Sequence, residues 1–189
     1  MNLVDRLEAF AGRRLAVGMI ALWAAAEAVV LPVVPDVGLG LLAVAAPRQA
    51  LRLFAAVIVG AVIGSLVLAA LVMAFPDGVR AMLVSLPGID AATLDEVGAA
   101  VSAQGIGAFA QFGPGPPLKV FTDAWVSQGV DVGAELVGTM LNRITRIGPV
   151  VIVAAIVGRA LATLIRVHDR LTVAAYAAAW IVFYGIYLG

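Results

Sequence analysis

Cysteine is absent from the 189-residue sequence, and histidine occurs once, as His168. Without cysteine the chain has no disulfide, no thiolate nucleophile and no cysteine-ligated metal site. A lone histidine cannot form a metal centre, and we interpret His168 as a neutral residue at a membrane interface. No serine–base pair, set of metal ligands or phosphate-binding loop occurs at a usable spacing. We therefore expect neither an enzyme nor a bound metal or cofactor.

Charge is scarce as well, since charged residues form only 13% of the chain. The 12 basic and 12 acidic side chains balance, so net charge indicates no particular partner, and we expect no nucleic-acid binding. Hydrophobic residues make up 63% of the chain, with a mean hydropathy of +1.07, whereas soluble domains are about 45–50% apolar. This composition predicts an integral membrane protein. We expect an all-α polytopic protein of a bacterial-type plasma membrane, with membrane lipids as partners.

The N-terminal segment, residues 1–14, differs from a cleaved signal peptide, because Asp5 and Glu8 lie in what would be its basic leader. Asn2 can cap a helix whose apolar face includes Leu3 and Leu7. We expect this segment to be retained as an amphipathic helix on the membrane surface. A frayed tail is the alternative.

Five long apolar blocks follow. They span residues 15–46, 49–75, 105–130, 132–167 and 171–188. A helix from Leu51 to Phe75 would be about 37 Å long, more than the ~30 Å hydrocarbon core, so the second block predicts a transmembrane helix. Its Gly60 and Gly64 have the small-xxx-small spacing of a close helix contact. The last block predicts a C-terminal transmembrane helix.

The first block is interrupted by Pro32 and Pro35, and neither of its arms spans a membrane alone. The arms measure about 24 Å and 15 Å as helices. Arginines flank the block on both sides: Arg13, Arg14, Arg48 and Arg52. By the positive-inside rule both ends then lie in the cytoplasm, together with the N-terminus. Residues 15–46 are therefore predicted to form a re-entrant helical hairpin, whose tip must be shielded by protein or line a wet cavity.

The third block is broken by a glycine and three prolines, and its flanks are acidic. The break comprises Gly113, Pro114, Pro116 and Pro117, and the flanking acids are Asp90, Asp95, Glu96, Asp131 and Glu135. Residues 105–130 should therefore form a second re-entrant hairpin with both ends outside. The preceding segment, 76–103, would be an external loop with a short helix near 91–103. Residues 132–167 would be a transmembrane helix kinked near 148–149.

The two broken blocks align at Pro32-x-x-Pro35 and Pro114-x-x-Pro117, and a long apolar helix follows each. Because the blocks would enter from opposite faces, the sequence predicts an inverted repeat of two re-entrant hairpins, each followed by a transmembrane helix. Transporters with such repeats place a site between discontinuous helices near the bilayer midplane.

Two acids lie in the first block, where a carboxylate near the bilayer centre costs roughly 2.5–3.5 kcal/mol on insertion scales. Asp36 follows Pro35 and could be a helix N-cap, a role that does not exclude function. Glu27 lies in mid-helix and has no capping role. It either pairs with a base, or it is neutral much of the time and handles a proton or a substrate.

Four more charged residues lie in the later apolar blocks. Lys119 and Asp123 are four residues apart and could neutralise each other. Lys119 also opens the half-helix after the second break, where a base and a helix N-terminus favour phosphate. Arg143 and Arg146 share a helix face. At the interface they would only snorkel, whereas at depth they would suit bidentate binding of phosphate.

These residues resemble the signatures of the DedA family, also called SNARE-associated Golgi or VTT-domain proteins. The first signature is similar to Glu27-x4-Pro32-x-x-Pro35-Asp36, followed by Gly60-x3-Gly64. The second and third, in the form of the YqaA-like branch, are similar to Pro116-Pro117-Leu118-Lys119-Val120-Phe121 and Arg143-x-x-Arg146. The resemblance covers most of residues 15–188.

The chain departs from the family pattern at a few positions. The family commonly has glutamate at Asp36, small residues where this chain has Asp123 and Trp125, and an aromatic residue at Ile147. The resemblance implies movement of a lipid-linked phosphate or a phospholipid across a bilayer, linked in several members to the proton-motive force. The implied acids are Glu27 and Asp36, and the implied bases are Lys119, Arg143 and Arg146.

We therefore predict translocation of a phosphate-bearing lipid, in which the bases receive the phosphate and Glu27 or Asp36 exchanges a proton. Two alternatives stay open. A proton-coupled antiporter for a small ion or a drug cation would use the same acids without an anion site. A non-transporting assembly or homeostasis factor would hold Glu27 in a closed salt bridge with no cavity. Whether the chain forms a homo-oligomer also stays open.

Overall fold

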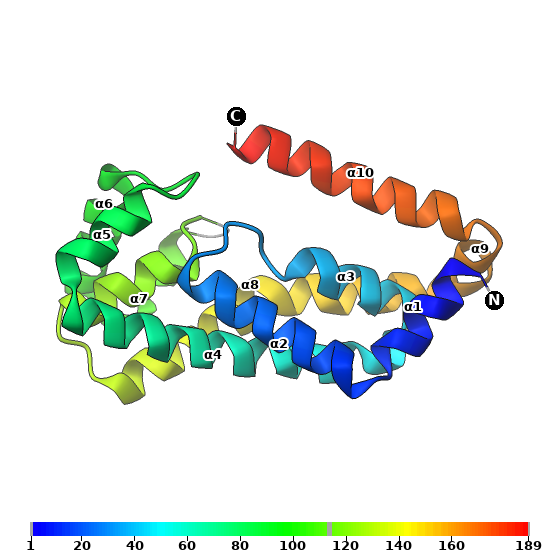
Figure 1. Cartoon of the computed structure of the whole chain (residues 1–189), viewed down its shortest axis with the longest axis horizontal. Coiled ribbons are helices and arrows are strands. Elements are labelled where there is room, and N and C mark those ends of the chain that lie inside the picture. The colour runs from blue at the N-terminus through cyan, green and yellow to red at the C-terminus, as the bar shows by residue number, and fades with distance from the viewer. Residues whose placement is uncertain (1, 113–114, 189) are drawn as a thin grey trace.

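The computed structural model describes residues 2–112 and 115–188, in which 86% of the chain is helical and no residue lies in a strand. In chain order the α-helices are α1 (Leu3–Ala11), α2 (Arg14–Val29), α3 (Asp36–Ala45), α4 (Ala50–Ala74), α5 (Pro76–Val84), α6 (Ala91–Gln104), α7 (Leu118–Ser127), α8 (Val132–Ala160), α9 (Ala162–Val167) and α10 (Asp169–Leu188), with 3₁₀ helices η1 (Pro47–Gln49) and η2 (Gly105–Phe112) (Figure 1). The predicted all-α class is confirmed.

Within the described ranges, two helical segments are long and apolar enough to cross a membrane: Pro47–Ala74, with 28 residues, and Val132–Ala160, with 29. A third span would result if α1 and α2, which are bent by 81°, formed one broken crossing. The predicted helix 132–167 ends earlier, because Leu161 leaves helical geometry (φ −106°, ψ 18°) and α9 begins after it. Pro149 lies inside α8, which stays helical on both sides of it.

The two arms that flank the first break run in opposite directions, and α4 returns beside them (Figure 1). The first arm, α2, packs along α4, whereas the second arm, α3, packs along α8. In the second half of the chain, η2 packs on α8, and α7 packs on both α4 and α8. Each long helix therefore contacts arms from both halves of the chain, which brings the two breaks close together.

Helix α2 lies on α4 at the two glycines that the sequence predicts as a close helix contact. A Cβ atom at Gly60 would overlap the carbonyl oxygen of Ala21, and one at Gly64 would overlap that of Ala25. The contact is confirmed, and it leaves no room for a side chain between the helices. Such close van der Waals packing is what holds helices together in lipid, where apolar side chains gain little by leaving the solvent.

The apolar core forms two clusters, and α4 contributes to both. Leu53 belongs to one cluster and Leu68 to the other. On α2, Ala24 belongs to the first cluster and Ala28 to the second, with Glu27 between them in the sequence. Glu27 therefore lies at the junction of two apolar clusters.

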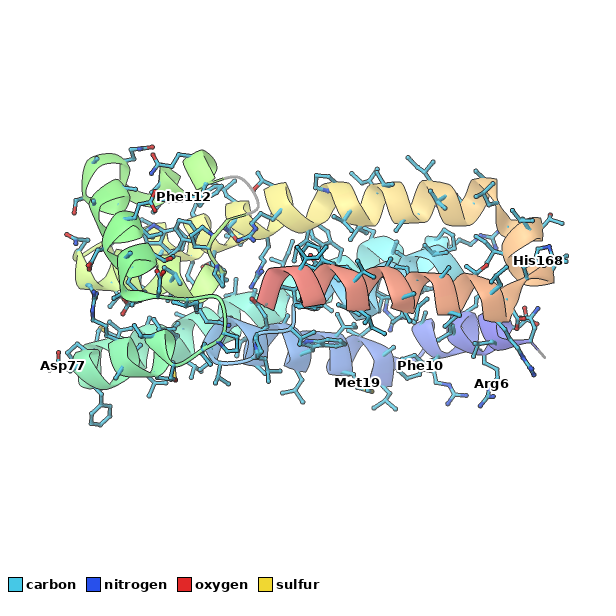
Figure 2. The ribbon with its side chains drawn as sticks, turned by 90° about the horizontal axis from the view of Figure 1, so that it is seen from above. Arg6, Phe10, Met19, Asp77, Phe112 and His168 are labelled. Carbon is cyan, nitrogen blue, oxygen red and sulfur yellow. The ribbon has the colours of Figure 1, made fainter. Side chains whose placement is uncertain are left out.

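Charged side chains distinguish the two ends of the molecule. Arg6 and His168 lie at one end, and Asp77 lies at the other (Figure 2). The helices and turns that meet at the Arg6 end carry Arg6, Arg13, Arg14, Arg48, Arg52, Arg159, Arg166 and Arg170. At the Asp77 end, α5 and α6 carry a single base, Arg80, which pairs with Asp95 at 2.6 Å.

The ends of α1 and α6 are capped by acidic or amide side chains. Asn2 caps α1 as predicted, since its Oδ1 accepts from the Asp5 amide at 2.8 Å and Asp5 accepts from the Asn2 amide at 3.3 Å. Asp90 caps α6, and the hydrogen bonds it accepts from the Thr93 hydroxyl and amide hold the pKa of Asp90 below its ordinary value. Arg166 of α9 pairs with Asp5 at 3.2 Å, which ties α1 to the C-terminal helices.

Gly60→Ala should lower the melting temperature in detergent micelles, because the added Cβ meets backbone that cannot move aside; overpacking of this kind costs about 1–3 kcal/mol or more. Gly18→Ala is the matched control on α2, since nothing lies within 4 Å of its Cβ position. The control should be neutral or gain up to about 1 kcal/mol of helix propensity. Equal melting temperatures for the two variants would contradict the close contact.

Candidate functional site

The backbone polar groups of the first break, residues 30–35, are bound by side chains from distant helices. Lys119 of α7 donates to the Leu31 carbonyl at 2.7 Å, and the Val34 amide donates to the Tyr184 hydroxyl of α10 at 2.9 Å. A break inside a membrane needs such partners, because hydrocarbon offers none to free N–H and C=O groups. Two backbone polar groups of the break predicted from Pro32 and Pro35 thus have protein partners.

The second break is held by an arginine of α8. Arg146 donates to the Pro116 carbonyl at 2.7 Å and to the Gly115 carbonyl at 3.1 Å. Two of the residues predicted to form this break, Gly113 and Pro114, lie outside the described residues. One guanidinium therefore satisfies two backbone acceptors where the helix cannot.

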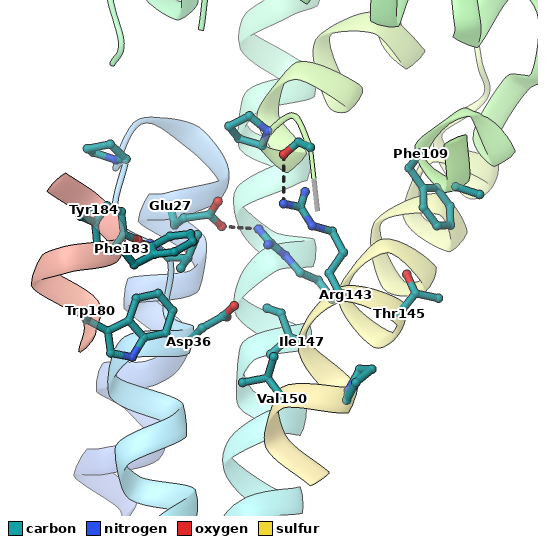
Figure 3. A pocket seen from close by; sticks show the side chains of 17 residues that line it. Glu27, Asp36, Phe109, Arg143, Thr145, Ile147, Val150, Trp180, Phe183 and Tyr184 are labelled. Atoms are coloured by element: carbon teal, nitrogen blue, oxygen red, sulfur yellow. Dashed lines mark hydrogen bonds and ion pairs between the residues drawn. The ribbon is translucent and has the colours of Figure 1, made fainter. Parts of the chain in front are cut away.

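Glu27 forms a buried ion pair with Arg143 (Figure 3). The two residues are 1% and 3% exposed, so neither charge is hydrated by bulk solvent. Of the two alternatives for Glu27, this is the one in which it pairs with a basic residue. The partner comes from a helix more than a hundred residues later in the chain. No described residue accepts from Arg143 Nε, which leaves this guanidinium with donor capacity beyond Glu27.

Asp36 is the first residue of α3, and Pro35 occupies the N-cap position without a side-chain hydrogen bond. The N-cap interpretation of Asp36 is therefore wrong, because the proline ahead of it takes that place. The carboxylate extends into the same space as Arg143 (Figure 3), and no described residue donates to its buried Oδ1. Arg143 and Arg146 both lie within electrostatic reach of it.

Arg146 lies at the midpoint of α8, 14 positions from each end, Val132 and Ala160. At 1.5 Å per residue both ends are about 21 Å away. Arg143 lies one turn nearer Val132 and is buried. If α8 spans the membrane symmetrically, both arginines lie near its middle, as the deep placement requires.

A cavity of about 620 Å³ receives residues from both breaks. Pro32 and Val34 line it from the first break, and Gly115 and Pro117 line it from the second. The charged side chains that reach it are Glu27, Asp36, Arg143 and Arg146. Its volume falls within the roughly 300–1,000 Å³ of small-molecule sites. Two segments far apart in the sequence thus share one charged cavity.

Aromatic side chains of α10 line another side of the cavity: Trp180, Phe183 and Tyr184 (Figure 3). The helix is held there by Tyr176, whose hydroxyl donates to the Val37 carbonyl at 2.9 Å. That hydroxyl lies against Gly40, where a Cβ atom would overlap it. The C-terminal helix therefore closes the cavity with an apolar, aromatic wall.

Lys119 and Asp123 do not line the cavity, although both are buried. The predicted neutralising pair between them is not among the ion pairs of the described residues, because Lys119 points to the Leu31 carbonyl instead. Lys119 lies within electrostatic reach of Glu27 and Arg143. It contributes to the site through the first break, whereas Asp123 lies within electrostatic reach of Arg80.

One buried acid was not predicted. Glu135, read from the sequence as part of an acidic outer flank, is 1% exposed and lies among the hydroxyls of Ser65, Thr122 and Thr139. The sequence could have indicated its burial, because Glu135 lies four residues before Thr139 on the same face of α8. Its closeness to Asp131, at the start of the helix, led us to group it with the acidic flank instead. Within the described residues, no group of three histidine, cysteine or acidic side chains could hold a metal ion.

Comparisons of the chain with protein-family models, with curated proteins and with solved structures each find no match. A functional conclusion therefore depends on the chemistry of the site.

Arg143→Met should destabilise the protein by about 3–5 kcal/mol, because it leaves the buried Glu27 carboxylate without a partner. The double variant Glu27→Leu/Arg143→Met removes both charges and should recover much of this loss. Thermal unfolding of the wild type, both single variants and the double variant completes the cycle. Additive effects would show that the two charges are not coupled.

Proposed function

We propose that the protein translocates a phosphate-bearing lipid, either a polyprenyl phosphate or a phospholipid, across the membrane. The observation that carries this proposal is the cavity between the two breaks, which has arginines and acids on one side and the aromatic wall of α10 on another. A ligand that suits both surfaces is amphipathic, with an anionic head beside the arginines and an apolar chain along α10. An anionic head group needs such a polar pathway because hydrocarbon does not solvate it.

The proposal includes an inverted repeat, in which residues 15–46 and 105–130 are re-entrant hairpins entering from opposite faces and α4, α8 and α10 span the membrane. The packing supports it, since the second arm of each hairpin, α3 or α7, contacts the long helix of the other half. The arginine-rich end also carries both ends of the first hairpin. By the positive-inside rule this end and the N-terminus face the cytoplasm.

The charges of the cavity suggest how a proton and a phosphate are coupled. Glu27 and Asp36 balance Arg143 and Arg146 when all four are ionised. A phosphate that binds the guanidiniums adds negative charge and competes with Glu27 for Arg143. Protonation of one acid restores the balance and frees donors of Arg143 for bidentate binding. A proton and the lipid head would therefore enter together and leave together.

The antiporter alternative is less favoured, because two arginines beside the acids would repel a cation. The assembly-factor alternative predicted a closed salt bridge with no cavity. The salt bridge between Glu27 and Arg143 is present, but it lines a cavity of about 620 Å³. The resemblance to the DedA family agrees with lipid translocation, and membership of that family is part of the proposal.

Liposomes test the function directly. The reconstituted protein should accelerate transfer of labelled polyprenyl phosphate or phospholipid between leaflets, and Arg146→Gln should reduce the rate at least tenfold, because it removes the head-group donor at the centre of α8. Arg159→Gln is the matched control: an exposed arginine on the same helix, outside the cavity. No transfer above that of empty vesicles, or equal loss in both variants, would overturn the proposal.

Glu27→Gln should separate binding from release. The amide mimics the protonated acid and leaves Arg143 available, so the variant should bind the labelled lipid phosphate roughly tenfold more tightly, about 1.4 kcal/mol. It should nevertheless transfer the lipid more slowly, and with less dependence on pH, because the lipid no longer leaves with a proton. Weaker binding by Glu27→Gln than by wild type would contradict the competition between Glu27 and phosphate.

A further inference from the structure

A second polar site lies away from the cavity, where Glu135 meets three hydroxyl groups. Ser65 of α4 and Thr139 of α8 hydrogen-bond to Glu135 Oε1, the latter at 3.2 Å. Ser65 Oγ also lies 2.9 Å from Thr122 Oγ1 of α7 and 3.0 Å from Thr139 Oγ1. All four residues are at most 1% exposed. Three helices therefore place their polar side chains around one carboxyl group in the protein interior.

No base pairs with this acid in the part of the chain that the structure describes. Its Oε2 is buried and receives no hydrogen bond from any described residue. A carboxyl group in such surroundings has neither bulk water nor an opposite charge to compensate its burial. Hydroxyl groups suit the neutral form, because they donate or accept as the proton requires.

The charged groups on the surrounding helices are engaged elsewhere or distant. On α4 the sole charge is Arg52, in the first turn of the helix, whereas Ser65 lies in its second half. On α8, Arg143 pairs with Glu27. Asp131, the N-cap of the same helix, accepts from the Ala134 amide at 3.0 Å.

The charged groups of α7, and of α5, which packs against α7, are also engaged elsewhere or do not offer Glu135 a positive charge. Lys119 donates to the Leu31 carbonyl at 2.7 Å. Asp123, next to Thr122, is buried and brings no positive charge to Glu135. Arg80 of α5 pairs with Asp95, and the exposed Asp77 lies at the start of that helix.

A polar face of α8 leads from this cluster to the cavity. This face begins at Glu135. The residues four, seven and eight positions later share the face, and they are Thr139, Asn142 and Arg143. Each of them is buried. No described residue hydrogen-bonds to either side-chain polar atom of Asn142, which lies between the cluster and Arg143. Buried polar atoms of this kind are usually bonded to water.

We propose that Glu135 is a second proton-binding site, held as a neutral carboxylic acid and connected to the cavity by the polar face of α8. The bound proton forms an O–H bond at Oε1 and makes a hydrogen bond to Ser65 Oγ, and the Ser65 hydroxyl in turn donates a hydrogen bond to Thr122 Oγ1 or Thr139 Oγ1. When the proton leaves, it passes to water beside Asn142, and Ser65 donates to the carboxylate again. This site does not depend on the lipid proposal, because it needs no substrate.

The spacing of the oxygens favours a proton over a metal cation. A cation held at about 2.4 Å by oxygen ligands keeps neighbouring ligands at right angles about 3.4 Å apart. The Ser65 hydroxyl lies 2.9 Å and 3.0 Å from its two threonine partners, which are hydrogen-bond distances. Binding a cation would have to push these groups apart, whereas a proton needs only a change of hydrogen-bond direction.

Infrared spectroscopy of the full chain in lipid nanodiscs tests the proposal. The wild type at neutral pH should show the C=O stretching band of a buried carboxylic acid, and Glu135→Gln should remove it, whereas Glu27→Gln should leave it in place. Should Glu135→Gln fail to fold, Ser65→Ala serves instead, because loss of one hydrogen bond must shift the band. No such band in the wild type, or an unchanged band in both Glu135→Gln and Ser65→Ala, would overturn the proposal.

Two further measurements test whether a metal cation binds at Glu135 and whether the proton reaches it along the polar face of α8. Sodium titrated against choline at fixed pH should leave the band unchanged; its loss with increasing sodium would replace the proton site by a cation site. After transfer to deuterated buffer, Asn142→Leu should slow the isotope shift of the band at least tenfold relative to wild type. An equal exchange rate would show that the proton does not pass along this face of α8.

Discussion

The ion pair between Glu27 and Arg143 is the interaction on which the rest of the structure depends. It joins α2 to α8 at the level where both helical breaks meet, and it does so between two apolar clusters. Breaking such a pair leaves an uncompensated buried charge, whereas the intact pair is close to neutral in energy. The pair therefore contributes alignment more than stability, because any displacement of α2 along α8 separates the two charges.

The same constraint explains the other bases in the interior. A chain that leaves helical geometry inside a membrane exposes carbonyl groups that hydrocarbon cannot bind. Lys119 and Arg146 each donate to carbonyls of a break, and they come from α7 and α8 rather than from the break itself. The basic side chains thus have a structural role, and in the proposed function Arg143 and Arg146 would also receive the phosphate. One set of cations can support the breaks and receive a phosphate.

The two buried acids differ in what surrounds them. Glu27 faces an arginine and lines a cavity, so its charge state is tied to whatever binds there. Glu135 accepts hydrogen bonds from Ser65 and Thr139 and has no basic partner among the described residues. The face of α8 that joins them carries Thr139 and Asn142, both buried. Under the two proposals, Glu27 would respond to the bound ligand and Glu135 would store a proton.

The sequence by itself determined the all-α class, the long helix that contains Gly60 and Gly64, the positions of the breaks and the unequal charge of the two ends. These properties are local, since composition, proline and helix length act within one segment. Only the tertiary structure decided which charges meet: Glu27 with Arg143, Lys119 with a carbonyl rather than with Asp123, and Glu135 with Ser65 and Thr122. The structure also excluded the N-cap alternative for Asp36, because Pro35 occupies that position, and it ended α8 at Ala160 rather than near residue 167. Partners of this kind lie on helices far apart in the sequence, and only close packing, such as that of α2 on the glycines of α4, sets the register in which they face each other.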